Sequence, residues 1–230
     1  MLAFANADGR VPCGLMSGTP IHSYDEIPFI VALFVVRNQS QSHMEVAHCG
    51  GTLIATDWVI TAAHCITPLS VVDPSKARVC HNILDPTIDK CKSYGKFVAV
   101  HPQYKERQLF ANDLAMIKIS PIETPVAKLP LLIAGSSLRG KYMTFTGWGN
   151  STLITKTELL IGNQCHNDLS LCTSSDENKG IICRGDSGGG LFYKKNTLVG
   201  VASLGHSTCI DVNAMTNFVV FVSVDKYLMW

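Results

Sequence analysis

The stretch Cys183-Arg184-Gly185-Asp186-Ser187-Gly188-Gly189-Gly190 places one serine between glycines, directly after an aspartate. A serine hydroxyl is a poor nucleophile at neutral pH, so it needs an adjacent base and donors directed at the oxyanion formed when it attacks a carbonyl. Glycines allow a tight turn whose backbone N–H groups come close to a bound substrate. The stretch is therefore a candidate nucleophile site. An ordinary glycine-rich turn is the alternative, since short motifs also arise by chance.

Two further segments supply the base and the acid that a serine nucleophile requires. Thr61-Ala62-Ala63-His64-Cys65 follows the apolar stretch 51–60, and Asn112-Asp113 precedes the alternating, strand-like run 114–119. Along the chain the order is His, Asp, Ser, which is one of the known orders of a catalytic triad. Ser187 is then the nucleophile, His64 its general base, and Asp113 the group that orients the imidazole. The other histidines are interpreted as structural: His22, His43, His48, His81, His101, His166 and His206.

With these three motifs in this order, the sequence resembles the trypsin/chymotrypsin family of serine proteases, the S1 peptidases. The resemblance runs from about Leu15 to Trp230, so it is more specific than any one motif. Each further segment that carries it could by itself be a generic β-strand; these segments are 28–33, 49–54, 101–104, the Gly-Trp-Gly run in 146–149, and 220–230. The resemblance implies an all-β fold of two six-stranded antiparallel β-barrels with a C-terminal helix. The active site would lie in the cleft between the barrels.

The domain organisation follows from the same resemblance and from local composition. Residues 1–7 read as the remnant of a signal peptide and 8–14 as a possible pro-segment, followed by a peptidase domain over 15–230. Barrel one is expected at about 28–120, barrel two at about 133–224, and the helix at 225–230. Pro121, Pro125 and Pro130 interrupt the strand pattern at the crossover between the barrels.

Composition and charge exclude several classes of partner. The net charge of +1 gives no electrostatic case for binding nucleic acid or an anionic membrane, and the longest apolar runs have strand length. The sequence predicts a soluble, secreted, extracellular protein that acts as a monomer. Its expected partners are protein or peptide substrates and protein protease inhibitors, and no cofactor is expected.

The nine cysteines also favour the secretory route, because cytosolic chains seldom hold so many. The resemblance implies three disulfides, namely Cys49 with Cys65, Cys165 with Cys172, and Cys183 with Cys209. Cys80 and Cys91 have no counterpart in the family and are paired by elimination, which leaves Cys13 over. A Cys/His metal site is the alternative, but the sequence has no Cys-x-x-Cys pair, and Asp85 with Asp89 makes a poor calcium site. No metal is therefore expected.

The resemblance also assigns the substrate-binding residues. The N–H groups of Gly185 and Ser187 would form the oxyanion hole. Trypsin-like members carry an aspartate six residues before the nucleophile, where this chain has Ile181, so a bound Lys or Arg side chain would lack its counter-charge. The remaining pocket residues would be Ile182, Ser203, Leu204, Gly205 and Val219. These residues predict an apolar S1 pocket, with chymotrypsin- or elastase-like rather than trypsin-like specificity.

Activation departs from the family pattern. Members usually expose a new amino terminus that pairs with the aspartate before the nucleophile, here Asp186, and Leu15 aligns best with that terminus. Gly14 is not a trypsin-type cleavage site, and Arg10-Val11 lies four residues upstream. The chain is therefore interpreted as a zymogen of a secreted serine endopeptidase. The alternative is a catalytically silent homologue that acts as a binding or regulatory decoy, whereas a β-domain without a site leaves the three motifs unexplained.

Overall fold

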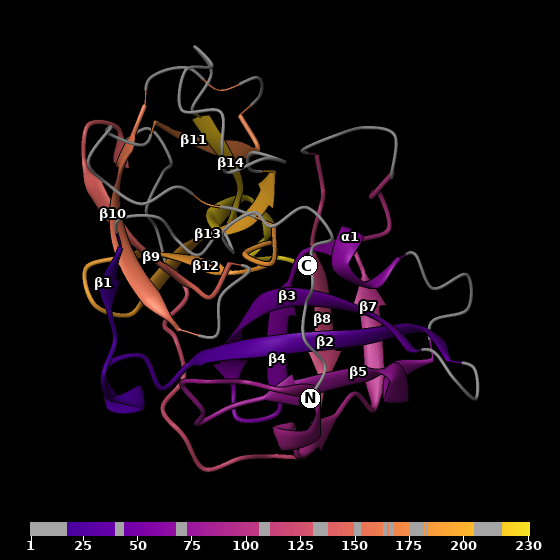
Figure 1. The fold of residues 1–230 in the computed structure, drawn as a ribbon. Helices are drawn as coiled ribbons and strands as arrows, with labels where there is room; N and C mark the ends of the chain where they lie inside the picture. Colours follow the sequence, from indigo (N-terminus) through magenta and orange to yellow (C-terminus); the bar gives the residue numbers. More distant parts are fainter. Residues whose placement is uncertain are drawn as a thin grey trace, which may run out of the picture.

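The computed structural model describes residues 18–39, 44–67, 73–105, 111–130, 138–149, 153–162, 165, 168–174, 182, 184–204 and 218–230. Within these ranges the chain forms two antiparallel sheets of seven strands each (Figure 1). The first sheet occupies the lower part of the figure, in indigo to magenta, and the second the upper part, in orange to yellow except for its indigo edge strand at residues 19–20.

The first sheet is built from the first half of the chain. Its strands are β2 (Ile30–Gln39), β3 (Met44–Ala55), β4 (Trp58–Thr61), β5 (Ala77–Cys80), β6 (Ser93–Tyr94), β7 (Phe97–Val100) and β8 (Ala115–Lys118). Their order in the sheet is β6-β5-β2-β3-β4-β8-β7. Strand β2 runs through the middle, and its apolar residues 30–36 are all buried, as expected for a strand covered on both faces.

The second sheet closes on itself. Its strands are β1 (Thr19–Pro20), β9 (Tyr142–Gly147), β10 (Thr155–Ile161), β11 (Ser170–Ser174), β12 (Gly190–Tyr193), β13 (Thr197–Leu204) and β14 (Phe218–Ser223). The order is β1-β10-β11-β14-β13-β12-β9, and β9 also pairs with β10. That pairing makes a closed barrel of six strands, with β1 as an added edge, whereas the first sheet forms a curled half-barrel.

Helical structure is sparse in the described residues. The one α-helical segment there is α1 (Ala63–Ile66), and the 3-10 helices are η1 (Tyr24–Glu26), η2 (Pro74–Lys76), η3 (Ile88–Lys90) and η5 (Val224–Tyr227). The expected all-β, trypsin-like fold is thus confirmed, while the C-terminal helix is a single 3-10 turn. None of the helices in the described ranges is long and apolar enough to cross a membrane.

Strand β1 belongs to the second sheet, although its place in the sequence suggests the first. Strand β1 precedes the whole first sheet, yet Thr19 pairs with Lys156 and Pro20 with Thr155 of β10. Proline has no N–H to donate, so an edge position suits Pro20. The chain therefore begins its described part on the second sheet before it enters the first.

The two halves share a hydrophobic core, which fixes their relative position. The larger buried cluster contains most of the first sheet and also Trp148, Phe192 and Val222 from the second half. The rings of Phe29 and Phe192 lie 4.9 Å apart across this junction. A second cluster, which includes Phe145 and Phe221, fills the closed barrel. Because the junction is buried and apolar, side chains that the two halves contribute to a common site keep a fixed relation.

Candidate active site

His64 lies on α1, immediately after β4, and the surrounding residues hold that short helix against β3. Its neighbour Cys65 forms a disulfide with Cys49 of β3, and the Thr61 hydroxyl donates a 2.8 Å hydrogen bond to the Gly50 carbonyl. A four-residue helix has little stability of its own, so these tertiary links define its position. The imidazole remains partly accessible, with 34% of the side chain exposed.

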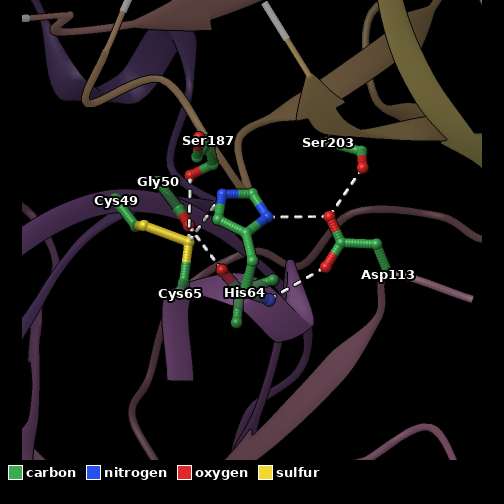
Figure 2. Close-up of a disulfide and its surroundings, with 8 residues drawn as sticks. Cys49, Gly50, His64, Cys65, Asp113, Ser187 and Ser203 are labelled. Atoms are coloured by element: carbon green, nitrogen blue, oxygen red, sulfur yellow. Dashed lines mark hydrogen bonds and ion pairs between the residues drawn. A yellow bond between two sulfur atoms is a disulfide. The ribbon is translucent and has the colours of Figure 1, made fainter. Parts of the chain in front are cut away.

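Asp113 lies just before β8 and holds His64 at two atoms. Asp113 Oδ1 accepts a 2.9 Å hydrogen bond from the His64 backbone N–H, and Oδ2 lies 2.7 Å from His64 Nδ1. The Ser203 hydroxyl of β13 donates a third bond, 2.6 Å long, to Oδ2 (Figure 2). An ionised carboxylate can only accept, so Nδ1 carries the proton and Nε2 is the free basic position of a neutral imidazole.

These contacts decide the charge of Asp113. The residue is only 4% exposed, and burial, the largest single influence, opposes ionisation. The hydrogen bonds from His64 and Ser203, together with the coulombic attraction that His64 exerts when it is protonated, outweigh burial and leave the pKa of Asp113 below its ordinary value. The carboxylate is therefore ionised at neutral pH.

Ser187 lies on the side of the imidazole away from Asp113 (Figure 2). Its carbonyl accepts a 2.7 Å hydrogen bond from Gly50 N–H, and the next residue, Gly188, donates a 2.8 Å bond to Ala202 of β13. Among the described residues no hydrogen bond joins Ser187 Oγ to His64 Nε2, and Nε2 lies 4.0 Å from Cys65 Sγ. Catalytic hydrogen bonds are often loose without substrate and tighten when it binds.

Two glycines of this loop are required by its geometry. Gly185 has φ +97° and Gly188 φ +79°, in the region that side chains disfavour. A Cβ on Gly188 would lie 2.1 Å from Thr61 Oγ1, and one on Gly185 would lie 2.2 Å from the Gly149 carbonyl oxygen. Within the described ranges the N–H groups of Gly185 and Ser187 make no hydrogen bond.

The predicted pocket residues fall into two groups. Ile182 and Val219 are buried in the apolar cluster of the closed barrel, and Ser203 and Leu204 end strand β13, with Leu204 38% exposed. Ile181, Gly205 and Leu15 lie outside the described residues, as do Cys183, Cys209 and Cys13.

Three of the expected disulfides are present, Cys49–Cys65, Cys80–Cys91 and Cys165–Cys172. The described part of the chain contains no His, Cys, Asp and Glu cluster suited to a metal ion.

Ser203 and His48 show what sequence reasoning missed. The sequence predicts Ser203 as a pocket residue, and the structure adds a contact of its hydroxyl with Asp113, 90 residues away. His48, expected to be a generic structural residue, makes a hydrogen bond with the Gly149 backbone, and Gly149 N–H donates a 2.7 Å bond to Asp186. Asp186 is 1% exposed and directly precedes Ser187. No local sequence signal marks either contact, because both join distant segments.

Burial of His48 predicts acid sensitivity. Its ring stacks on Phe34 at 4.9 Å, and its Nε2 is buried without a partner among the described residues. Burial lowers the pKa of His48 from 6.5 to about 4. Between these values the unfolded chain takes up a proton at this residue that the native chain does not, so stability falls as pH falls from 6.5 to 4. The expected loss is about 2–3 kcal/mol.

The variant His48→Phe tests this contribution by urea unfolding between pH 7 and 4. Phenylalanine can keep the contact with Phe34 and cannot take up a proton, so the variant should lose less stability across this range than the unmodified protein. His22→Gln, at an exposed histidine, is the matched control and should keep the original slope. Equal slopes for His48→Phe and the unmodified protein would contradict the prediction.

Comparison with known proteins agrees with this geometry. The family model described as Trypsin matches residues 16–230. Granzyme M of Rattus norvegicus is 29% identical over 228 residues, which cover 88% of this chain and 82% of that protein. A chymotrypsin of Phaedon cochleariae is 31% identical over 203 residues, covering 79% and 70%. A solved structure of HL collagenase matches with a TM-score of 0.74 at 22% identity, covering 93% and 95%, and so supports the fold. This chain belongs to the trypsin family of serine proteases.

Proposed function

We propose that this protein is a secreted serine endopeptidase that cleaves peptide bonds through an acyl-enzyme formed on Ser187. The observation that carries the proposal is the pairing of His64 Nδ1 with Asp113 Oδ2 at 2.7 Å, with the Ser187 loop on the opposite side of the ring. This arrangement matches the roles of base, orienting acid and nucleophile in a triad.

In the first half-reaction Ser187 Oγ attacks the scissile carbonyl carbon while His64 Nε2 accepts the hydroxyl proton. The new Oγ–C bond gives a tetrahedral intermediate whose oxyanion is bound by the N–H groups of Gly185 and Ser187. His64 then gives the proton to the amine nitrogen as the C–N bond breaks. In the second half-reaction water replaces the amine, and the same steps release the acid and restore Ser187. Asp113 stays ionised throughout and stabilises the imidazolium.

The loop contacts support a preorganised oxyanion site. The Gly50 bond to Ser187 and the Gly188 bond to Ala202 attach the loop to one strand of each sheet. Donors held this way need little reorganisation when the negative charge develops. Each oxyanion-hole N–H donor contributes about 2.7–4 kcal/mol of transition-state stabilisation.

The proposed specificity is for an apolar residue on the acyl side of the cleaved bond. Ile182 and Val219 support it, because both are apolar and buried in one cluster. Ile181, at the position where trypsin-like members carry aspartate, is also apolar. A lysine or arginine side chain in such a pocket would be desolvated without a counter-charge, which costs several kcal/mol.

Activation is proposed to follow the family route, with cleavage before Leu15 and insertion of the new amino group toward Asp186. Support comes from the burial of Asp186 and from its bond to Gly149, which couple this carboxylate to the loop carrying Ser187. A buried carboxylate is stabilised by a cationic partner. The three disulfides support an oxidising compartment and hence secretion.

A panel of peptide amides that differ only at the residue before the cleaved bond tests the specificity. Phe, Leu, Val, Ala and Lys are compared by kcat/KM on the processed chain. Apolar residues should exceed Lys by at least about 100-fold, the effect of a burial difference of roughly 3 kcal/mol. Preference for Lys would contradict the proposed pocket. A folded, processed chain that cleaves none of them would favour the silent homologue that binds without catalysis.

A further inference from the structure

The residue before Asp113 has an unusual backbone conformation. Asn112 has φ +60°, one of three non-glycine residues with positive φ in the described ranges, the others being Asn82 and Lys194. Asparagine tolerates the left-handed region better than most residues, but the conformation persists only where the surroundings hold it. Leu114 N–H also donates a 2.8 Å bond back to the Asn112 carbonyl, which makes a tight turn around Asp113.

Tyr227 of η5 holds Asn112 at two atoms. Its phenolic oxygen accepts a 3.2 Å hydrogen bond from the Asn112 backbone N–H and donates a 3.1 Å bond to Asn112 Oδ1. A phenol can donate and accept at once, so a single hydroxyl fixes both the backbone and the side chain of this residue. The two residues are separated by 115 positions, so the C-terminal turn closes onto the loop of the triad acid.

Tyr227 is itself held in place by aromatic contacts. His101 meets the Tyr227 ring edge-on at 5.2 Å and the Trp230 ring at 5.0 Å. The His101 backbone N–H donates a 3.0 Å bond to the Leu114 carbonyl, one residue after Asp113. The same histidine thus connects the C-terminal turn to the far side of the loop. Both ends of the loop are therefore linked to Tyr227. Asn112 is hydrogen-bonded to it directly, and Leu114 is linked to it through His101.

The charge of Asp113 affects the pKa of Tyr227. The pKa of Tyr227 is raised, first by burial and further by the nearby Asp113 carboxylate. The phenol is therefore protonated at every pH at which a serine protease works, and its O–H remains available to Asn112.

We propose that Tyr227 is a positioning residue that fixes Asp113, and through it His64, by holding Asn112 in the left-handed conformation. The proposal rests on the proposed function, since a positioned triad matters only if the triad works. Without the hydroxyl, the Asn112 N–H and Oδ1 lose their partner and the strained residue can relax. Asp113 then moves relative to His64, and shifts of about 1 Å in such groups reduce turnover by up to about 100-fold.

Tyr227→Phe keeps the ring between His101 and Trp230 and removes only the hydroxyl. We expect kcat per active site, counted by burst titration, to fall about tenfold for a short amide substrate while KM changes less than twofold. Tyr94→Phe, at an exposed tyrosine that contacts Arg78, is the matched control and should leave both parameters unchanged. A merely structural role would lower the number of active sites or the melting temperature and leave kcat per site intact, which would overturn the proposal.

A second measurement does not depend on activity. The proton shared by His64 Nδ1 and Asp113 gives a far-downfield proton resonance, which can be recorded on the folded chain and on its Ser187→Ala form. It should shift or broaden in Tyr227→Phe and stay in place in Tyr94→Phe. An unmoved resonance overturns the positioning role. If the unmodified, processed chain cleaves nothing, the proposed function fails while this resonance still tests the geometry.

Discussion

Ser187→Ala is expected to lower kcat for a peptide substrate by about a millionfold, the loss typical when a triad nucleophile is removed. The remaining rate would come from binding and from the oxyanion donors, which do not depend on the hydroxyl. Ser187 contributes to the fold through its backbone, since its carbonyl accepts the Gly50 bond and its Oγ has no partner among the described residues. The variant should therefore fold with a stability within about 0.5 kcal/mol of the unmodified protein.

Measurement of kcat on the same amide substrate, together with urea unfolding, separates the two effects. Ser75→Ala is the matched control, because Ser75 is an exposed serine whose hydroxyl donates a hydrogen bond to Asp73. It should retain full activity. A Ser187→Ala variant that is folded and keeps more than a hundredth of the activity would show that another group supplies the nucleophile.

Asp113→Asn is expected to lower kcat by about 10⁴-fold, the effect of presenting the wrong imidazole tautomer in Ser-His-Asp proteases. The asparagine amide can donate toward His64 Nδ1, so the ring proton moves to Nε2 and the ring can no longer accept the proton of Ser187. The replacement keeps the size of the side chain, and its amide oxygen can still accept from the His64 backbone N–H, as Oδ1 does in the unmodified protein. The amide nitrogen takes the place of Oδ2, 2.6 Å from the Ser203 oxygen, so the Ser203 hydroxyl would accept there instead of donating. The loss should appear in kcat, with KM little changed.

Steady-state kinetics at pH 7 measure this loss. The matched control is Asp85→Asn, since Asp85 is an exposed carboxylate paired with Lys90 and remote in sequence from the three motifs. A loss of less than about tenfold for Asp113→Asn would mean that this carboxylate does not set the tautomer of His64. The mechanism proposed above would then need another orienting group.

Local sequence signals predicted the fold class and the order of the three site residues. The Ala-Ala-His-Cys and Gly-Asp-Ser-Gly-Gly runs carry their chemistry in adjacent residues, and Cys49 and Cys65 hold the first run against β3. What the sequence could not predict depends on long-range packing. The Ser203 bond to Asp113, the Tyr227 bonds to Asn112 and the pairing of β1 with β10 each join segments about 90 or more residues apart. No periodicity or motif encodes such contacts.

Local sequence signals are equally limited in predicting specificity and activation. The interpretation of the pocket depends on Ile181 and Gly205, and that of the new terminus on Leu15, all outside the described residues. For Ile182 and Val219 the sequence indicated apolar character, and burial of both in one cluster agrees with it. Asp186 is buried and accepts a hydrogen bond from Gly149 N–H, a contact that no local pattern in the sequence predicts.

In the proposed mechanism Ser187 is a nucleophile that His64 and Asp113 activate. A fluorophosphonate probe reacts covalently with an activated serine, so labelling of the purified chain tests the claim most directly, before and after limited proteolysis near residues 10–15. We expect labelling that increases after cleavage, maps to Ser187 and disappears in Ser187→Ala. Absence of Ser187-dependent labelling in both states, from a protein shown to be folded, would contradict it.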